Sequence, residues 1–303
     1  MDPITIITIL SGFAGIIGLF YLLVVGQRSI PEWWRDFKKS RRDKAEKKDD
    51  EEKLLPYKQY VNIIRKFWKF PEEAHLDVVC SEIPEEERHY FANPKDRNYL
   101  RYAKFADLDS LIYIRAGIAQ VFPQLHVRDF SPSEYYDTHT EGLIVIGGPA
   151  WNPKFNEFQT QLPFHFISKP VGEDEILIIE PVKGSAFRPT WDKNKELIKD
   201  ISIFARIHIE KEIPVYLIAG CLTFGVLGAA KCFLDRKLGP SNINHIERLV
   251  NGDDFISVFE TFKVGGFVAT PDLSAKEPLV VLRKMGLNFD VIVANTVGYQ
   301  KTR

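Results

Sequence analysis

The sequence has little of what marks a metal-binding, disulfide-stabilised or nucleic-acid-binding protein. It has 3 cysteines and 7 histidines in 303 residues, with no C-x-x-C pair and no H-E-x-x-H motif, so no metal site is expected. It also lacks a G-K-[ST] phosphate loop and a G-x-S-x-G nucleophile elbow. The 40 basic and 41 acidic side chains nearly cancel, which argues against a globally basic nucleic-acid-binding protein. The remaining composition, 45% hydrophobic and 27% charged, is that of an ordinary globular chain.

One long hydrophobic run lies near the N-terminus. Residues 4–25 carry no charged side chain. As a helix they would measure about 33 Å, enough for a bilayer core of about 30 Å. The run is too long for the apolar part of a signal peptide, and neither a basic region before it nor an A-x-A site after it is present. The sequence therefore predicts a single-pass membrane anchor over residues 1–27, in contact with the bilayer through residues 4–25.

The residues in and after this run predict its orientation and a helix–helix contact. Nine basic residues follow it within residues 28–48: Arg28, Arg35, Lys38, Lys39, Arg41, Arg42, Lys44, Lys47 and Lys48. Basic flanks stay in the cytoplasm, so the N-terminus is expected outside the cell membrane and the rest of the chain inside. Ser11 with Gly15, and Ala14 with Gly18, are small-xxx-small pairs that let two membrane helices approach closely. They predict self-association, with a simple tether as the alternative.

The sequence divides into three segments: the anchor, a connector over residues 28–70 and a domain over residues 71–303. The first part of the connector is almost wholly charged. Its last part, residues 54–70, reads LLPYKQYVNIIRKFWKF and mixes apolar with basic residues. That pattern favours an amphipathic helix that packs on the domain or lies on the membrane, and we prefer the first alternative.

The domain has the pattern of an α/β protein. A helix is expected over residues 105–122, between apolar runs that read as strands. Strands are expected over residues 76–80, 125–130, 142–146, 175–181, 200–210, 214–219, 255–264, 266–269 and 289–294, and a second helix over residues 228–237. Strands alternating with a helix indicate parallel pairing, and short connections in the middle indicate antiparallel pairing. The sequence predicts a Rossmann-like mixed sheet with an antiparallel extension.

A glycine turn follows the strand at residues 142–146. Gly147 and Gly148 come directly after the apolar run, and adjacent glycines permit positive φ angles and close approach of a ligand. Trp151 offers a stacking surface, and Asn152 is suited to cap the next segment. Ligands of open α/β sheets bind beyond the carboxyl ends of the strands, which is where this turn should lie.

A second glycine turn runs through residues 217–234. Gly220 ends a strand, and Thr223, Gly225 and Gly228 lead into a helix of small residues. A strand, a glycine turn and a helix together present backbone N–H groups to an anion. The spacing is G-x4-G-x2-G and not G-x-G-x-x-G, so the glycines could equally serve tight packing of a helix on a strand. Together the two turns predict one site for a nucleotide or another phosphate-bearing ligand.

The two glycine motifs resemble those of a known protein family. IGGPAWN, followed about seventy residues later by LIAGCLTFGVLGAAKCFL, resembles a family of bacterial Rossmann-like domains with a GGP-x-x-N turn and an AG-x4-GT-x-AA turn. The resemblance spans residues 75–300 and implies the Rossmann-like fold, but the family has no assigned reaction. Val226 stands where threonine is usual, which removes one hydroxyl that could bind phosphate.

Three classes of function remain open. The first is a membrane-anchored cytoplasmic domain that senses or binds a nucleotide. The second is an N-glycosidase that cleaves NAD or nucleosides. Glu157 is its candidate catalytic carboxylate, by fold-level analogy, and a surface carboxylate is the alternative. The third is a structural or assembly protein with no ligand.

Overall fold

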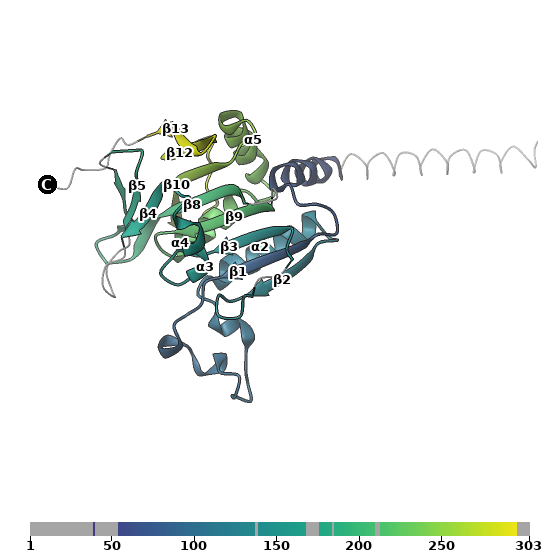
Figure 1. Cartoon of the computed structure of the whole chain (residues 1–303), viewed down its shortest axis with the longest axis vertical. Coiled ribbons are helices and arrows are strands. Elements are labelled where there is room, and N and C mark those ends of the chain that lie inside the picture. Colours follow the sequence, from purple (N-terminus) through teal and green to yellow (C-terminus); the bar gives the residue numbers. More distant parts are fainter. Residues whose placement is uncertain are drawn as a thin grey trace, which may run out of the picture. The chain divides into compact units, whose positions relative to one another are not determined.

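The computed structural model describes residue 39 and residues 54–136, 139–167, 176–183, 185–209 and 213–295. The chain forms two compact units, Met1–Gln59 and Tyr60–Arg303. Of the first unit, residue 39 and residues 54–59 are described, and they are helical. Every strand of the described residues lies in the second unit (Figure 1).

The prediction of a single-pass membrane anchor is contradicted. Within the described residues, no helix is both long and apolar enough to cross a bilayer. The helix α2 (Leu108–Val121), for example, has 14 residues, whereas a span needs about 20. The run at residues 4–25, its four small residues Ser11, Ala14, Gly15 and Gly18, and the connector up to residue 53, Lys39 excepted, lie outside the described residues. The fold class is therefore that of a mixed α/β domain.

A 10-stranded mixed sheet forms the centre of the domain, in the order β13-β12-β10-β8-β9-β3-β1-β2 along its main path. The parallel part consists of β1 (His75–Cys80), β2 (His126–Phe130), β3 (Gly142–Ile146) and β9 (Ile213–Gly220). The antiparallel part consists of β8 (Leu197–Ile209), β10 (Phe255–Val264), β12 (Val280–Met285) and β13 (Asn288–Ala294), with β7 (Thr190–Trp191) on β8 and β11 (Phe267–Val268) on β10. A separate sheet of three strands contains β4 (Phe164–Ile167), β5 (Ile176–Ile179) and β6 (Ala186–Phe187).

The other helices are α3 (Pro153–Gln159), α4 (Thr223–Cys232) and α5 (Gly239–Val250), with 3-10 turns η1 (Glu85–Glu87), η2 (Tyr90–Ala92) and η3 (Arg101–Lys104) after β1. The helix expected over residues 228–237 begins earlier, at Thr223. The reason is a long-range contact, because the buried Asp200 on β8 accepts hydrogen bonds from the backbone N–H groups of Leu222 and Gly225. A carboxylate at a helix N-terminus stabilises an earlier start than local sequence favours.

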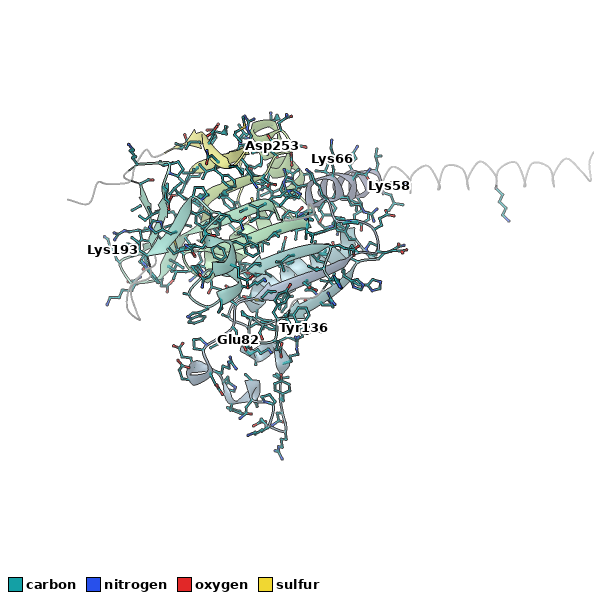
Figure 2. All side chains as sticks on the ribbon, in the orientation of Figure 1. Lys58, Lys66, Glu82, Tyr136, Lys193 and Asp253 are labelled. Atoms are coloured by element: carbon teal, nitrogen blue, oxygen red, sulfur yellow. The ribbon has the colours of Figure 1, made fainter. Side chains whose placement is uncertain are left out.

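One face of the sheet is covered by helices, including residues 60–68. Trp68 is fully buried and packs on Tyr216, with ring centroids 4.5 Å apart, and Phe67 stacks on Phe233 at 5.0 Å. The Tyr60 hydroxyl donates to the carbonyl of Leu234 at 2.9 Å. The exposed Lys66 lies on the outer side of the helix (Figure 2). This segment thus belongs to the core of the unit that begins at Tyr60.

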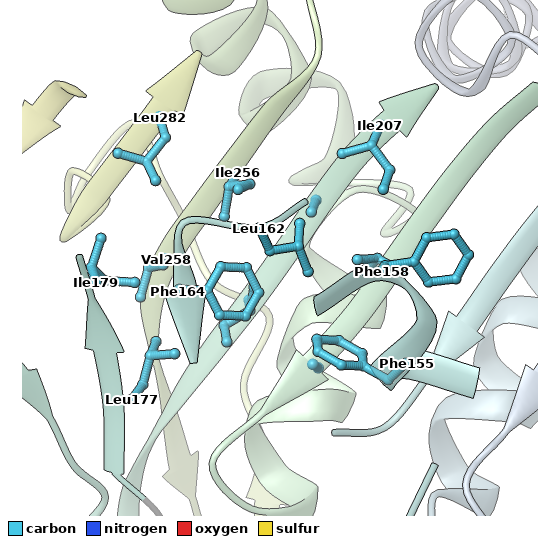
Figure 3. Close-up of a cluster of buried hydrophobic side chains, with 14 of the residues drawn as sticks. Phe155, Phe158, Leu162, Phe164, Leu177, Ile179, Ile207, Ile256, Val258 and Leu282 are labelled. Carbon is cyan, nitrogen blue, oxygen red and sulfur yellow. The ribbon is translucent and has the colours of Figure 1, made fainter. Parts of the chain in front are cut away.

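The opposite face of the sheet carries a second core. Phe155 and Phe158 of α3 and Phe164 of β4 pack with β5 and with alternate residues of the large sheet (Figure 3). On β8 the alternation is direct, because Ile203 faces this core whereas Phe204 contacts the aromatic rings under the helices. Both faces therefore carry apolar cores, in which a few polar side chains such as Asp200 and Arg206 are buried.

Candidate functional site

The two glycine turns lie next to each other at one edge of the sheet. β3 and β9 are parallel neighbours, with Ile146 opposite Ile218, so both chains leave the sheet at their carboxyl ends. A Cβ atom added to Gly148 would lie 3.7 Å from the carbonyl oxygen of Gly220. The structure thus brings together the two motifs that the sequence singled out.

The order of the strands reverses beside the first turn. From β1 the chain passes through α2 to β2 on one side, and then to β3 on the other side of β1. Such a switch point is where open α/β sheets place their ligands. The residues that follow the two strands here are Ser81 and Glu82 after β1, and Gly147 and Gly148 after β3 (Glu82 is labelled in Figure 2).

Position 147 requires glycine, because of both its backbone conformation and its close neighbours. Its φ angle is +96°, which a side chain rarely adopts, and its N–H donates to Ile218 O at 2.9 Å. A Cβ atom would lie 2.6 Å from the Cβ of Ser81 and 2.7 Å from Oδ2 of Asp107. The glycine therefore brings the backbone of the turn against a serine and an aspartate.

Ser81 and Asp107 form a buried polar pair at this point. The Ser81 hydroxyl donates to Asp107 Oδ2, and Asp107 is only 6% exposed. Burial raises the pKa of the Asp107 carboxyl to about 6, although the Ser81 hydrogen bond acts in the opposite direction. No donor in the described part of the chain reaches the other carboxylate oxygen of Asp107. The sequence analysis missed this pair, since the two residues lie 26 positions apart and each is unremarkable alone.

Asn152 has a structural role within the first turn. Its fully buried side chain donates to Ile146 O at 2.8 Å and to Val79 O at 3.1 Å, tying the ends of β3 and β1 together. Its oxygen accepts the N–H of Lys154, so it caps α3 as predicted. Trp151 is 42% exposed at the surface of the same turn, where a ligand ring can stack on it.

The second turn does not leave its helix N-terminus free. The N–H groups of Leu222 and Gly225 donate to Asp200 Oδ2 at 3.1 and 2.6 Å, and Asp200 is fully buried. A carboxylate of the chain itself thus occupies the place expected for a ligand phosphate. Thr223 is the exposed first residue of α4.

The glycines of the second turn are in tight contact with their surroundings. A Cβ atom on Gly220 would lie 2.6 Å from the carbonyl carbon of Gly225. On Gly225 it would collide with the carbonyl oxygen of Ile201, and on Gly228 with the side chain of Thr261. These contacts support the packing interpretation for Gly225 and Gly228.

The Glu157 side chain makes its ion pair within α3 and not with residues of the switch point. Its carboxylate pairs with the Lys154 ammonium group at 2.5 Å, one turn earlier on α3, and its side chain is 59% exposed. This is the geometry of a surface ion pair. Asp107 is the carboxylate that the fold places beside the first turn.

Comparison with known proteins assigns neither a family nor a function to the chain. The chain matches no protein-family model, no curated protein and no solved structure. The resemblance carried by the two glycine motifs therefore stays a prediction. Within the described ranges, no group of three or more His, Cys, Asp or Glu side chains is placed to hold a metal ion.

The raised pKa of Asp107 gives a first test. The carboxyl binds its proton more tightly in the folded state, with a pKa of about 6, than at its ordinary value of 3.8. Stability should therefore fall as pH rises from about 4 to 6, and stay reduced above that range. Asp107→Asn should raise the free energy of unfolding at pH 7.5 by about 2 kcal/mol, with little gain at pH 4.

Thermal unfolding of the full chain at both pH values measures this effect. Asp109→Asn is the matched control, because Asp109 is an exposed carboxylate on the same helix turn and should gain nothing. An equal gain for Asp107→Asn at pH 4 and pH 7.5 would show that ionisation is not the cause.

Proposed function

We propose that the domain binds a nucleotide-like ligand where the carboxyl ends of β1 and β3 meet, and that it holds the nucleoside part of that ligand. The observation that carries the proposal is the buried Ser81–Asp107 pair, which offers one carboxylate oxygen at the point where the strand order reverses. A buried polar group with spare bonding capacity, at the usual ligand position of the fold class, is a candidate for ligand contact.

The chemistry of these residues suits a sugar and a base. An acidic residue near the switch point commonly accepts the ribose hydroxyls in dinucleotide-binding sheets, and Asp107 is suited to that role. Hydrogen bonds from hydroxyl groups to a carboxylate are strong where water is excluded. The exposed indole of Trp151 offers a face for the base. Gly148 follows Gly147 in the same turn, and a Cβ added there would be in ordinary contact with the Gly220 carbonyl at 3.7 Å.

The phosphate part is not expected at the N-terminus of α4. Asp200 already accepts the N–H groups there, and a second anion would meet its buried charge. We therefore expect adenosine and AMP to bind with similar affinity, and inorganic phosphate not to compete with either.

Isothermal titration of the full chain with adenosine, AMP, NAD and inorganic phosphate tests the proposal. Asp107→Asn should weaken nucleoside binding about 10-fold or more, because one hydrogen bond to a charged group is worth about 1.5–3 kcal/mol. Asp109→Asn should bind normally. Absence of binding by the parent chain at several millimolar, or equal binding by Asp107→Asn, would contradict the proposal and favour an assembly protein.

An N-glycosidase is the second candidate, and one observation favours it. A carboxyl group with a pKa of about 6 exchanges protons readily near neutral pH, which a general acid or base requires. Asp107, and not Glu157, would then stand beside the sugar. Release of nicotinamide from NAD, or of adenine from adenosine, measured by chromatography, separates this activity from binding alone.

A further inference from the structure

A hollow lies at the amino ends of the same parallel strands, opposite the two glycine turns. It has a volume of about 490 Å³ and is formed by the second half of α2, the loop that follows it and the first residues of β1 and β2. Its polar lining consists of His75, Arg115, His126 and Arg128. No acidic side chain is among the lining residues.

The two histidines stand side by side. His75 and His126 begin β1 and β2 and are paired in the parallel register of these strands. Their ring centroids lie 5.2 Å apart with an angle of 33° between the planes, and both residues are exposed. Imidazoles in this arrangement can donate together to one acceptor.

The two arginines are held in place by groups behind them. Arg115 donates to Val127 O at 3.0 Å and lies 3.3 Å from Asp129, and Arg128 contacts Asp77 at 2.8 Å. Their side chains nevertheless remain 38% and 36% exposed. Guanidinium groups fixed in this way lose little freedom when they bind an anion.

The carboxylates of Asp77, Asp129 and Glu141 offset the charge of the two arginines, but none of them lines the hollow. Glu141 accepts the backbone N–H of His75 at 2.9 Å, and the fully buried Asp77 faces Arg128. The carbonyl of Val121, at the negative end of α2, accepts a hydrogen bond from Arg65 at 2.8 Å. The rest of the lining is apolar and comprises Ala119, Phe122, Pro123, Leu125 and Val127.

We propose that this hollow is a binding site for a small organic anion, a carboxylate or phosphate attached to an apolar body. The anionic group lies against the imidazoles and guanidinium groups, and the apolar body covers the side chains of α2 and its following loop. This site is independent of the nucleoside site, since it lies at the amino ends of the strands and shares no residue with it.

Phenyl phosphate is the probe, and its affinity for the full chain is measured by isothermal titration. The double substitution His75→Gln and His126→Gln should weaken binding about 10-fold or more, and 500 mM salt should weaken it further than 50 mM salt. His165→Gln is the matched control, because His165 is a partly exposed histidine on the distant strand β4. Asp107→Asn should leave the affinity for phenyl phosphate unchanged.

Three results would overturn the proposal. The first is equal affinity of the parent and the double variant, with both folded as judged by thermal unfolding. The second is equal affinity for phenyl phosphate and the uncharged benzyl alcohol, which would reduce the hollow to an apolar surface. The third is that the parent chain binds zinc chloride but not phenyl phosphate, and that the double variant no longer binds zinc. That result would make the two histidines a metal site.

Discussion

A chain that begins at Pro71 should fail to fold, whereas one that begins at Leu54 should unfold in a single cooperative transition. The shorter chain loses Tyr60, Ile64, Phe67 and Trp68, all of which are buried in the core. Burial of each such side chain contributes about 1.5–3 kcal/mol, and their sum is comparable to the whole stability of a domain. Circular dichroism during heating distinguishes the two outcomes.

Loss of this helix also removes an aromatic ring and a hydrogen-bond acceptor that surround a buried charge. The fully buried Arg206 lies over the ring of Phe67 at 5.1 Å and donates to the Phe67 carbonyl at 3.2 Å. Within the chain from Leu54, Trp68→Ala should cost about 3–5 kcal/mol, and Lys66→Ala on the exposed side should cost almost nothing. A cooperative transition of the chain from Pro71 would show that residues 60–68 are not part of the core.

Alanine at Gly228 or Gly225 should prevent folding or strongly destabilise the fold, whereas alanine at Gly148 should be tolerated. The new methyl group would collide with Thr261 at the first position and with the Ile201 carbonyl at the second. At Gly148 it would meet its nearest neighbour at an ordinary contact distance of 3.7 Å. All three substitutions add the same methyl group, so the comparison isolates the space available.

Yield of soluble protein and the melting temperature test this comparison. Gly225→Ala and Gly228→Ala should be insoluble or lower the melting temperature by more than about 10 °C. Gly148→Ala should stay within a few degrees of the parent and should alter ligand binding if the first turn contacts the ligand. Retained stability of Gly228→Ala would show that α4 does not pack as closely on β10 as described.

The sequence was informative where local pattern decides the structure. Residues 142–146 are apolar throughout and follow a polar loop, which is enough to predict a buried central strand, and β3 is that strand. The pair Gly147–Gly148 after it was enough to place a turn at the carboxyl end. The strand β12 (Val280–Met285) and the helix α5 (Gly239–Val250) were not predicted. The pattern of α5 was overlooked, because Ile243, Ile246 and Val250 recur at helical spacing and are buried.

The site could be predicted only in part, because its chemistry depends on distant residues. The neighbouring position of the two turns follows from parallel pairing of β3 and β9. The bond from Ser81 to Asp107 and the cap that Asp200 provides join residues more than twenty positions apart. The raised pKa of Asp107 follows from burial, which the composition of its own helix does not reveal.

Hydrogen–deuterium exchange of the full chain, with and without adenosine at ten times its dissociation constant, tests the central claim most directly. If the nucleoside binds beside Asp107, backbone exchange should slow in peptides that contain residues 81–83, 107–110 and 147–152. Peptides from the β12–β13 hairpin, at the far end of the sheet, should be unchanged. Unchanged exchange in the first three regions, with slower exchange elsewhere in the domain, would contradict the assignment of the site.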